Sequence, residues 1–249
     1  MLTGAAVCPH PPILVPETTG GDAGGTGRGA RELGRLRAAC DEAVAGLVRL
    51  RPDVLVIVGG AERSGDHPVS APGCLSRFGV WAGTPDGVTR AALGGGDGSG
   101  TVLPLSLTIG RWLVDRAGRG PADLRLLAIA EAAPVAECLA AGARIAARAP
   151  RVALLVMGEG PARRVQGVPG AADPEADRYD AEIAAAFAGA DARALAALDA
   201  RRSAGLLVSG RAPWQVLAGA AEGGFRGQVT YTGAPFEVSY LVATWHREP

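Results

Sequence analysis

The sequence predicts a single α/β domain, a sandwich in which helices flank a central, mainly parallel sheet. Two patterns favour this fold. Short apolar runs alternate with segments of helical periodicity, and no linker, internal repeat or change of composition divides residues 1–249. A chain of 249 residues with 48% hydrophobic content can bury about 70% of its unfolded surface, so its core needs no disulfide or metal.

Buried strands are predicted where short, continuous apolar runs stop at proline or glycine. Leu2–Val7 is followed by Pro9, Val54–Val58 by Gly59-Gly60, and Arg151–Met157 by Gly158. Further strands are expected at Leu124–Ala130, Val229–Thr232 and Glu237–Trp245, and one near Phe78–Trp81.

Helices are predicted where apolar residues recur every three or four positions. Arg31–Leu50 has such a stripe, with arginine and glutamate on the other face. Asp173 is expected as an N-cap before Pro174, and Pro134 in a first turn. The remaining predicted helices are Leu105–Ala117, Pro134–Ala149, Asp173–Ala188, Asp191–Ala200 and Ala212–Ala221. Residues 16–30 and 59–104 are predicted as loops, and the glycine content of 59–104 permits a lid over a pocket.

Composition excludes several classes of function. All 25 basic residues are arginine, so no lysine can form a Schiff base, hold pyridoxal phosphate or complete a Walker A loop. The 25 acidic residues cancel this charge, which leaves no basic surplus for nucleic acid or an anionic membrane. No apolar run approaches the roughly 18 residues of a membrane span. The glycine-rich run at 94–100 follows no predicted strand and is interpreted as surface loop rather than a phosphate site.

The cysteines and the N-terminus favour a cytoplasmic protein. Cys8, Cys40, Cys74 and Cys138 form no CxxC pair, and three of them lie in apolar or helical patterns as free thiols. The first residues carry no positive charges of the kind that open a signal peptide.

Candidate functional residues follow the carboxyl ends of the predicted strands, where α/β proteins place their sites. His10 lies between prolines and suits a metal ligand or a general base, although a structural hydrogen bond is the alternative. Glu159, before Arg163 and Arg164, indicates either a charged pocket or an ordinary loop ion pair. His67 is expected in a solvated turn. The four loops also supply Glu17, Glu62, Asp66 and Glu237.

The segment from Cys8 to Glu17, CPHPPILVPE, and the strand segment Pro52–Val58 resemble the class III extradiol ring-cleavage dioxygenases. The likeness is greatest to the Memo-like members and to those that resemble the catalytic beta chain of these enzymes. Met157–Arg164, Gly210–Leu217 and Ala234–Tyr240 resemble blocks of an alanine-rich actinobacterial group of such proteins. The resemblance runs over most of the chain and implies the same α/β fold.

Active members of that family hold Fe(II) with two histidines and a glutamate, and a further histidine acts as acid and base. By resemblance, His10 matches the first metal histidine and Glu237 the carboxylate. The second metal histidine is replaced by Ala61, and the acid/base histidine by Ala162. A methyl group supplies no lone pair, so the iron site is incomplete unless His67, Glu62 or Glu159 substitutes.

These residues leave three hypotheses. The first is a divergent member that binds a small molecule or a partner, in a pocket built from His10, Glu17, Glu62, Glu159, Arg163 and Arg164, alone or as a homo-oligomer. The alternative is a non-haem Fe(II)-dependent dioxygenase that cleaves a catechol-like ring. A third hypothesis is a hydrolase or lyase that uses His10 with Glu159.

Overall fold

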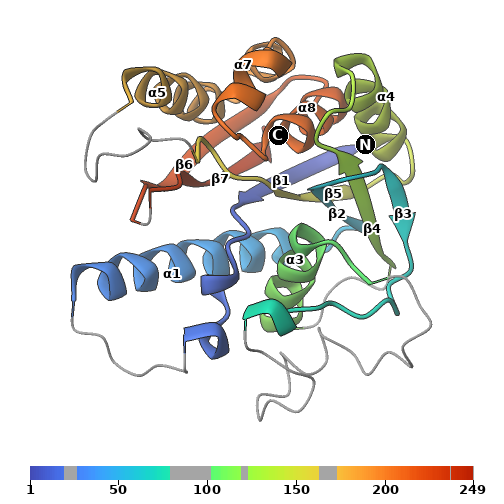
Figure 1. The fold of residues 1–249 in the computed structure, drawn as a ribbon. Coiled ribbons are helices and arrows are strands. Elements are labelled where there is room, and N and C mark those ends of the chain that lie inside the picture. The colour runs from blue at the N-terminus through green and yellow to red at the C-terminus, as the bar shows by residue number, and fades with distance from the viewer. Residues whose placement is uncertain (20–26, 79–101, 119–122, 163–172, 236, 249) are drawn as a thin grey trace.

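A computed structural model describes residues 1–19, 27–78, 102–118, 123–162, 173–235 and 237–248. A sheet of seven strands in the order β3-β4-β2-β5-β1-β7-β6 forms its centre (Figure 1). The strands are β1 (Leu2–Cys8), β2 (Val54–Ala61), β3 (Gly65–His67), β4 (Asp123–Ala130), β5 (Val152–Met157), β6 (Phe225–Gly233) and β7 (Tyr240–Arg247).

The middle of the sheet is parallel, as predicted. β4, β2, β5 and β1 run side by side in one direction, and β3, β7 and β6 add antiparallel edges. The strands β4, β2, β5 and β1 therefore present their carboxyl ends at one edge of the sheet, where α/β folds place ligands.

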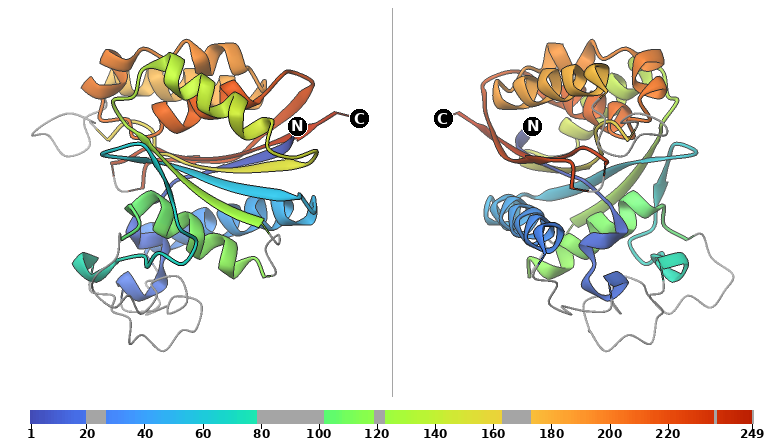
Figure 2. Two further views of the ribbon diagram at one scale, coloured as in Figure 1. Left: turned by 90° about the vertical axis from the view of Figure 1, so that its right-hand side faces the viewer. Right: turned by 60° about the vertical axis from the view of Figure 1, so that its left-hand side comes forward.

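Helices cover both faces of the sheet (Figure 2). On one side lie α1 (Arg28–Arg49) and α3 (Leu105–Arg116). The other layer contains α4 (Val135–Ala146), α5 (Pro174–Ala188), α6 (Ala192–Ala196), α7 (Ala200–Gly205) and α8 (Arg211–Ala220). Three 3₁₀ turns, η1 (Pro12–Leu14), η2 (Pro16–Thr19) and η3 (Ser76–Phe78), complete the described elements. No described helix combines the length and the apolar character needed to cross a membrane.

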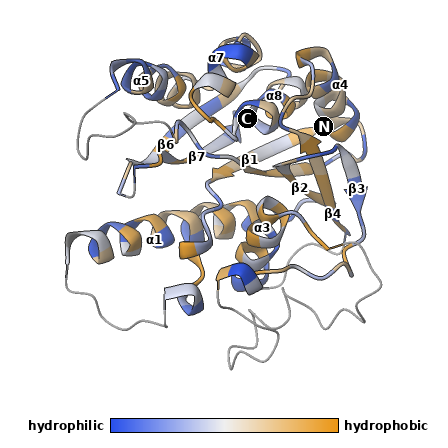
Figure 3. Cartoon of the chain, viewed as in Figure 1, coloured by the Kyte–Doolittle hydropathy of each residue, from blue (hydrophilic) through white to orange (hydrophobic). Residues whose placement is uncertain are grey.

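Alternate residues of each central strand enter different cores. In β5, Val152, Leu154 and Val156 belong to the core under α4, α5 and α8. Leu155 and Met157 belong to the core on the side of α1 and α3. Both faces are therefore buried, which explains why the central strands are continuous apolar runs (Figure 3).

Several predicted boundaries differ from the structure. The expected helix Asp191–Ala200 is two helices, because Asp199 accepts a hydrogen bond from the Arg202 amide at 2.6 Å and caps a new helix. The expected strand near Phe78–Trp81 is wrong at its start, where Ser76–Phe78 form η3. Residues 79–81 lie outside the described residues.

Two predicted strand ends are also wrong. β2 continues through Gly59 and Gly60 to Ala61, because it pairs along its whole length with β4. The last strand begins at Tyr240 and not at Glu237, since Glu237 has a φ of 62° and cannot continue a strand. The sequence pattern does not predict the short strand β3, because three residues carry no detectable periodicity.

Candidate functional site

The sheet order brings His10 and Glu159 together. β1 and β5 are neighbours, and their pairing continues beyond the strands through the Gly158 amide and the Cys8 carbonyl at 3.0 Å. The next residues along each chain segment then meet, and the His10 backbone N–H donates to Glu159 Oε1 at 3.2 Å. The sequence predicted both residues, and the structure places them at one point of the sheet edge.

Glu159 is held by the segment before α8. Its backbone N–H donates to Ser209 Oγ at 3.2 Å, and its carbonyl accepts from the Gly210 N–H at 3.0 Å. The sequence pattern does not indicate Ser209, because it is 50 residues away from Glu159 and belongs to no recognisable motif. These contacts fix the direction of the Glu159 side chain toward His10.

The His10 side chain is buried but incompletely hydrogen-bonded. It is 8% exposed, and within the described part of the chain its Nδ1 atom has no hydrogen-bond partner. Leaving a buried polar atom without a partner costs about 1–3 kcal/mol. The ring nitrogen is therefore free to bind a ligand atom.

The segment after His10 is a compact turn rather than the extended loop expected. η1 and η2 follow Pro11, and the Arg37 side chain of α1 donates to the carbonyls of Leu14 and Ile13, both at 2.9 Å. Glu17 lies in η2 with its Oε2 atom buried and, among the described residues, without a hydrogen-bond partner. The α1 helix thus fixes the loop that carries two candidate polar groups.

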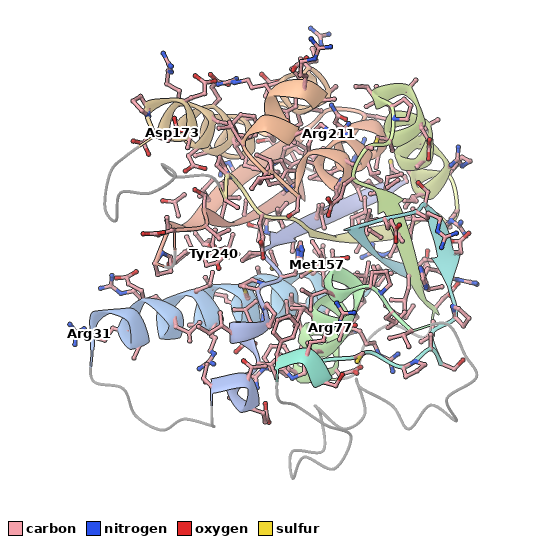
Figure 4. The ribbon with its side chains drawn as sticks, viewed as in Figure 1. Arg31, Arg77, Met157, Asp173, Arg211 and Tyr240 are labelled. Carbon is pink, nitrogen blue, oxygen red and sulfur yellow. The ribbon has the colours of Figure 1, made fainter. Side chains whose placement is uncertain are left out.

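Tyr240 also borders this edge of the sheet. Burial raises the pKa of its phenol well above the ordinary value, and the nearby Glu159 carboxylate and Tyr231 phenol act in the same direction. Figure 4 shows Tyr240 and Met157, the last residue of β5, near the centre of the molecule. The phenol of Tyr240 therefore stays protonated beside the Glu159 carboxylate.

Glu237 and Glu62 are less closely connected to His10. Glu237 is exposed in the turn before β7, and no described contact brings it to His10. Glu62 is also exposed, and β5 separates its strand, β2, from β1. Arg163 and Arg164 lie outside the described residues.

His67 does not lie in the turn that the sequence predicted. It is the last residue of β3, opposite Leu126, at the outer edge of the sheet. β3 is separated from β1 by four strand spacings, or about 19 Å. His67 therefore cannot serve as a substitute ligand beside His10.

The two alanines occupy structured positions. Ala61 ends β2 opposite Ala130, and the Ala162 amide donates to the Leu206 carbonyl at 3.0 Å. Among the described residues, no group of three or more histidine, cysteine, aspartate and glutamate side chains is arranged to hold a metal ion. The described residues therefore do not fit the two-histidine, one-carboxylate iron centre that the resemblance implies.

A pocket of about 370 Å³ adjoins the Glu159 loop. Gly160, Tyr240 and Trp214 contribute to its wall, and the opposite side is formed by α5. Asp180 and Ser239 supply polar groups there, joined by a hydrogen bond of 2.5 Å from Ser239 Oγ to Asp180 Oδ2. Its volume is within the range of small-molecule sites.

Comparison with known proteins supports the fold. No family model and no curated protein matches the chain. A crystal structure titled as an uncharacterized protein, JW3007 from Escherichia coli K12, is similar with a TM-score of 0.52 over 97% of this chain and 99% of that one. The two sequences are 14% identical. This likeness establishes the α/β fold alone.

Proposed function

We propose that this chain is a divergent relative of the class III extradiol dioxygenases that binds a small polar molecule at the carboxyl ends of β1 and β5. The supporting observation is the buried His10 imidazole, whose Nδ1 atom has no partner among the described residues. Its neighbour Glu159 holds the His10 backbone in place. A ligand that hydrogen-bonds to Nδ1 would remove the cost of the unpaired nitrogen.

The residues have separable roles in this proposal. His10 contacts the ligand through its ring, and Glu159 positions His10 through the backbone amide. The protonated Tyr240 phenol supplies a second hydrogen-bonding group at the same edge. Glu159 contacts the backbone and not the imidazole, so the geometry does not support the third hypothesis, a histidine–carboxylate pair for hydrolysis.

The second candidate is the Fe(II)-dependent extradiol dioxygenase. An unpartnered imidazole nitrogen also suits a metal, and this observation favours the candidate. Against it stand Ala61, Ala162 and the lack of a third ligand among the described residues. Iron binding with ring cleavage is therefore the alternative outcome of one experiment.

That experiment measures the binding of catechol, used as a probe, by anaerobic calorimetry with and without Fe(II). We expect binding without metal, and a decrease of roughly tenfold in His10→Ala because one hydrogen bond to the ligand is lost. His246→Ala is the matched control, since His246 is exposed and pairs with Gly4 near the other end of β1.

Metal content and reaction with oxygen separate the two candidates. Near-stoichiometric iron that is lost in His10→Ala, with ring cleavage after oxygen is admitted, would establish the dioxygenase instead. Catechol binding that is absent, or equal in the wild type and His10→Ala, would contradict the proposed site.

A further inference from the structure

A second pocket, of about 550 Å³, lies on the helical layer that contains α7 and α8. Its wall combines apolar and charged side chains from α7, from the segment after β4 and from the start of α8. The residues that matter here are Glu131, Arg201, Leu207, Val208, Ser209 and Arg211. None of them enters the proposed function except Ser209, which contacts Glu159.

Arg211 is a buried cation in this wall. Its side chain is 2% exposed (labelled in Figure 4), and its Nη1 atom donates to the Ala133 carbonyl at 2.9 Å and to Gln215 Oε1 at 2.8 Å. Its Nη2 atom donates to the Glu131 carbonyl. All three acceptors are neutral, and in the described part of the chain no carboxylate forms an ion pair with Arg211.

A guanidinium group keeps its positive charge at every physiological pH. Burying such a charge without a counter-ion costs free energy that neutral acceptors offset only in part. The pocket beside Arg211 is the place from which an anion could neutralise this charge. Arg201, which is exposed at the same pocket, adds a second positive charge.

Glu131 is the acidic residue among the described pocket residues, and it leaves the balance positive. Its side chain extends toward the end of β2, where Cγ would lie 3.3 Å from a Cβ atom added to Gly60. The two arginines against one glutamate give the described wall a net charge of about +1.

The rest of the wall is apolar. Leu207 is 62% exposed and has a φ of 56°, a left-handed conformation that is unfavourable for a leucine. Val208 lies beside it in the same wall. An exposed leucine held in this conformation next to a cavity indicates a surface that contacts an apolar group.

We propose that this pocket binds a small oxyanion, a carboxylate or a phosphate, that is carried on an apolar body. Arg211 and Arg201 attract the oxyanion, and Leu207 and Val208 pack against the apolar body. The proposal goes beyond the His10 site and does not depend on it. The two sites are nevertheless connected, because Ser209 lines this pocket and accepts the hydrogen bond from the Glu159 amide.

The test compares three probes, sodium phosphate, acetate and hexanoate, by calorimetry at constant ionic strength. Phosphate and acetate distinguish the two kinds of oxyanion, and hexanoate adds an apolar chain to the carboxylate. We expect hexanoate to bind more tightly than acetate. Arg211→Gln should weaken every probe that binds by roughly tenfold or more, because a charge-assisted hydrogen bond is removed.

Two further variants keep the test decisive if Arg211→Gln does not fold. Arg211→Lys keeps the charge but not the planar pair of donors, so oxyanion binding should weaken. Leu207→Gly relieves the left-handed strain and removes the apolar contact, so it should weaken hexanoate alone. Arg35→Gln, on an exposed side chain of α1, is the matched loss of charge and should change nothing.

The outcomes are exclusive. Binding of hexanoate that weakens in the Arg211 and Leu207 variants but not in Arg35→Gln supports the pocket. Failure of all three probes to bind the wild-type protein, or equal binding by the wild type and the variants that fold, overturns it. His10→Ala reports on the catechol site, so failure of either proposal is seen separately.

Discussion

At the scale of single residues, close packing of glycines shapes the edge that carries the candidate site. A Cβ atom at Gly59 would lie 2.4 Å from Ser106 Oγ, and one at Gly158 would lie 2.6 Å from the Cα atom of Gly210. A Cβ atom at Gly210 would lie 2.1 Å from the Trp214 ring. These positions admit no side chain, because the neighbouring atoms belong to backbone or to closely packed groups.

Gly210→Ala is predicted to destabilise the protein by at least about 2 kcal/mol, because the methyl group overlaps Trp214. The free energy of unfolding in urea measures the effect. Gly205→Ala is the matched control, since no atom lies within 4 Å of its Cβ position. That substitution should be neutral or add about 0.5–1 kcal/mol within α7. Equal effects of the two substitutions would contradict this account of the packing.

Glu17 shows a residue whose chemistry was predictable but whose setting was not. Its place after a predicted strand made it a candidate, yet the sequence did not show that its Oε2 atom is buried in a 3₁₀ turn. The loop that carries it is held by Arg37, which binds two loop carbonyls from a helix more than 20 residues away. Such long-range hydrogen bonds leave no local pattern.

At the scale of elements, aspartate caps define several helix starts. Asp173 accepts a hydrogen bond from the Glu175 amide at 2.9 Å, as the sequence predicted, and Asp191 does the same for Ala194. The cap of α7, Asp199, lies inside a segment that the sequence predicted as a single helix. Capping was recognised where a loop preceded the aspartate and was missed where another helix did.

Asp173→Ala is predicted to lower the free energy of unfolding by about 1 kcal/mol, because the first turn of α5 loses its side-chain acceptor. Asp173→Asn keeps an oxygen acceptor and should stay within a few tenths of a kcal/mol of the wild type. Chemical denaturation measures both variants. A cost that is the same for alanine and asparagine would show that the charge, and not the cap, is the source of the effect.

Helix packing against helix is a further feature of this scale. α4 and α8 approach so closely that a Cβ atom at Gly142 would lie 2.0 Å from the Val216 carbonyl oxygen. A Cβ atom at Gly219 would lie 2.2 Å from the Leu139 carbonyl oxygen. The periodicity predicted both helices, but only the packed structure shows that these two glycines set their separation.

At the scale of the whole molecule, all three tyrosines are buried and all have a raised pKa. Burial is the main cause at Tyr179, Tyr231 and Tyr240, because the phenolate is poorly solvated in the core. Unfolded tyrosines ionise near pH 10. The folded state therefore keeps protons that the unfolded state releases at alkaline pH.

The sign of the pH dependence follows from this difference in bound protons. The stability is fully present below about pH 10 and falls as the pH rises further, since the unfolded state then binds fewer protons than the folded one. A tyrosine that stays protonated in the folded state lowers the free energy of unfolding by about 1.4 kcal/mol at pH 11. The chain has no lysine, so no lysine titration overlaps with this range.

Tyr240→Phe is predicted to lose about 1.4 kcal/mol less stability than the wild type between pH 9 and about 11. Denaturation at several pH values measures the difference. Buried Cys40 and Cys138, whose pKa is also raised, titrate equally in both proteins and cancel in the comparison. Parallel curves for the two proteins would mean that Tyr240 ionises normally in the folded state.

The sequence by itself determined the class of fold, most of the strands and helices, and the residues His10 and Glu159 as candidates. It could do so because burial on both faces of the sheet produces continuous apolar runs, and because strand ends are marked by proline and glycine. Only the tertiary structure decided that Glu159 contacts the His10 backbone, that His67 lies at the far edge and that Arg211 is buried beside a pocket. The order of strands and the packing of distant segments set these relations, and neither is encoded in local periodicity.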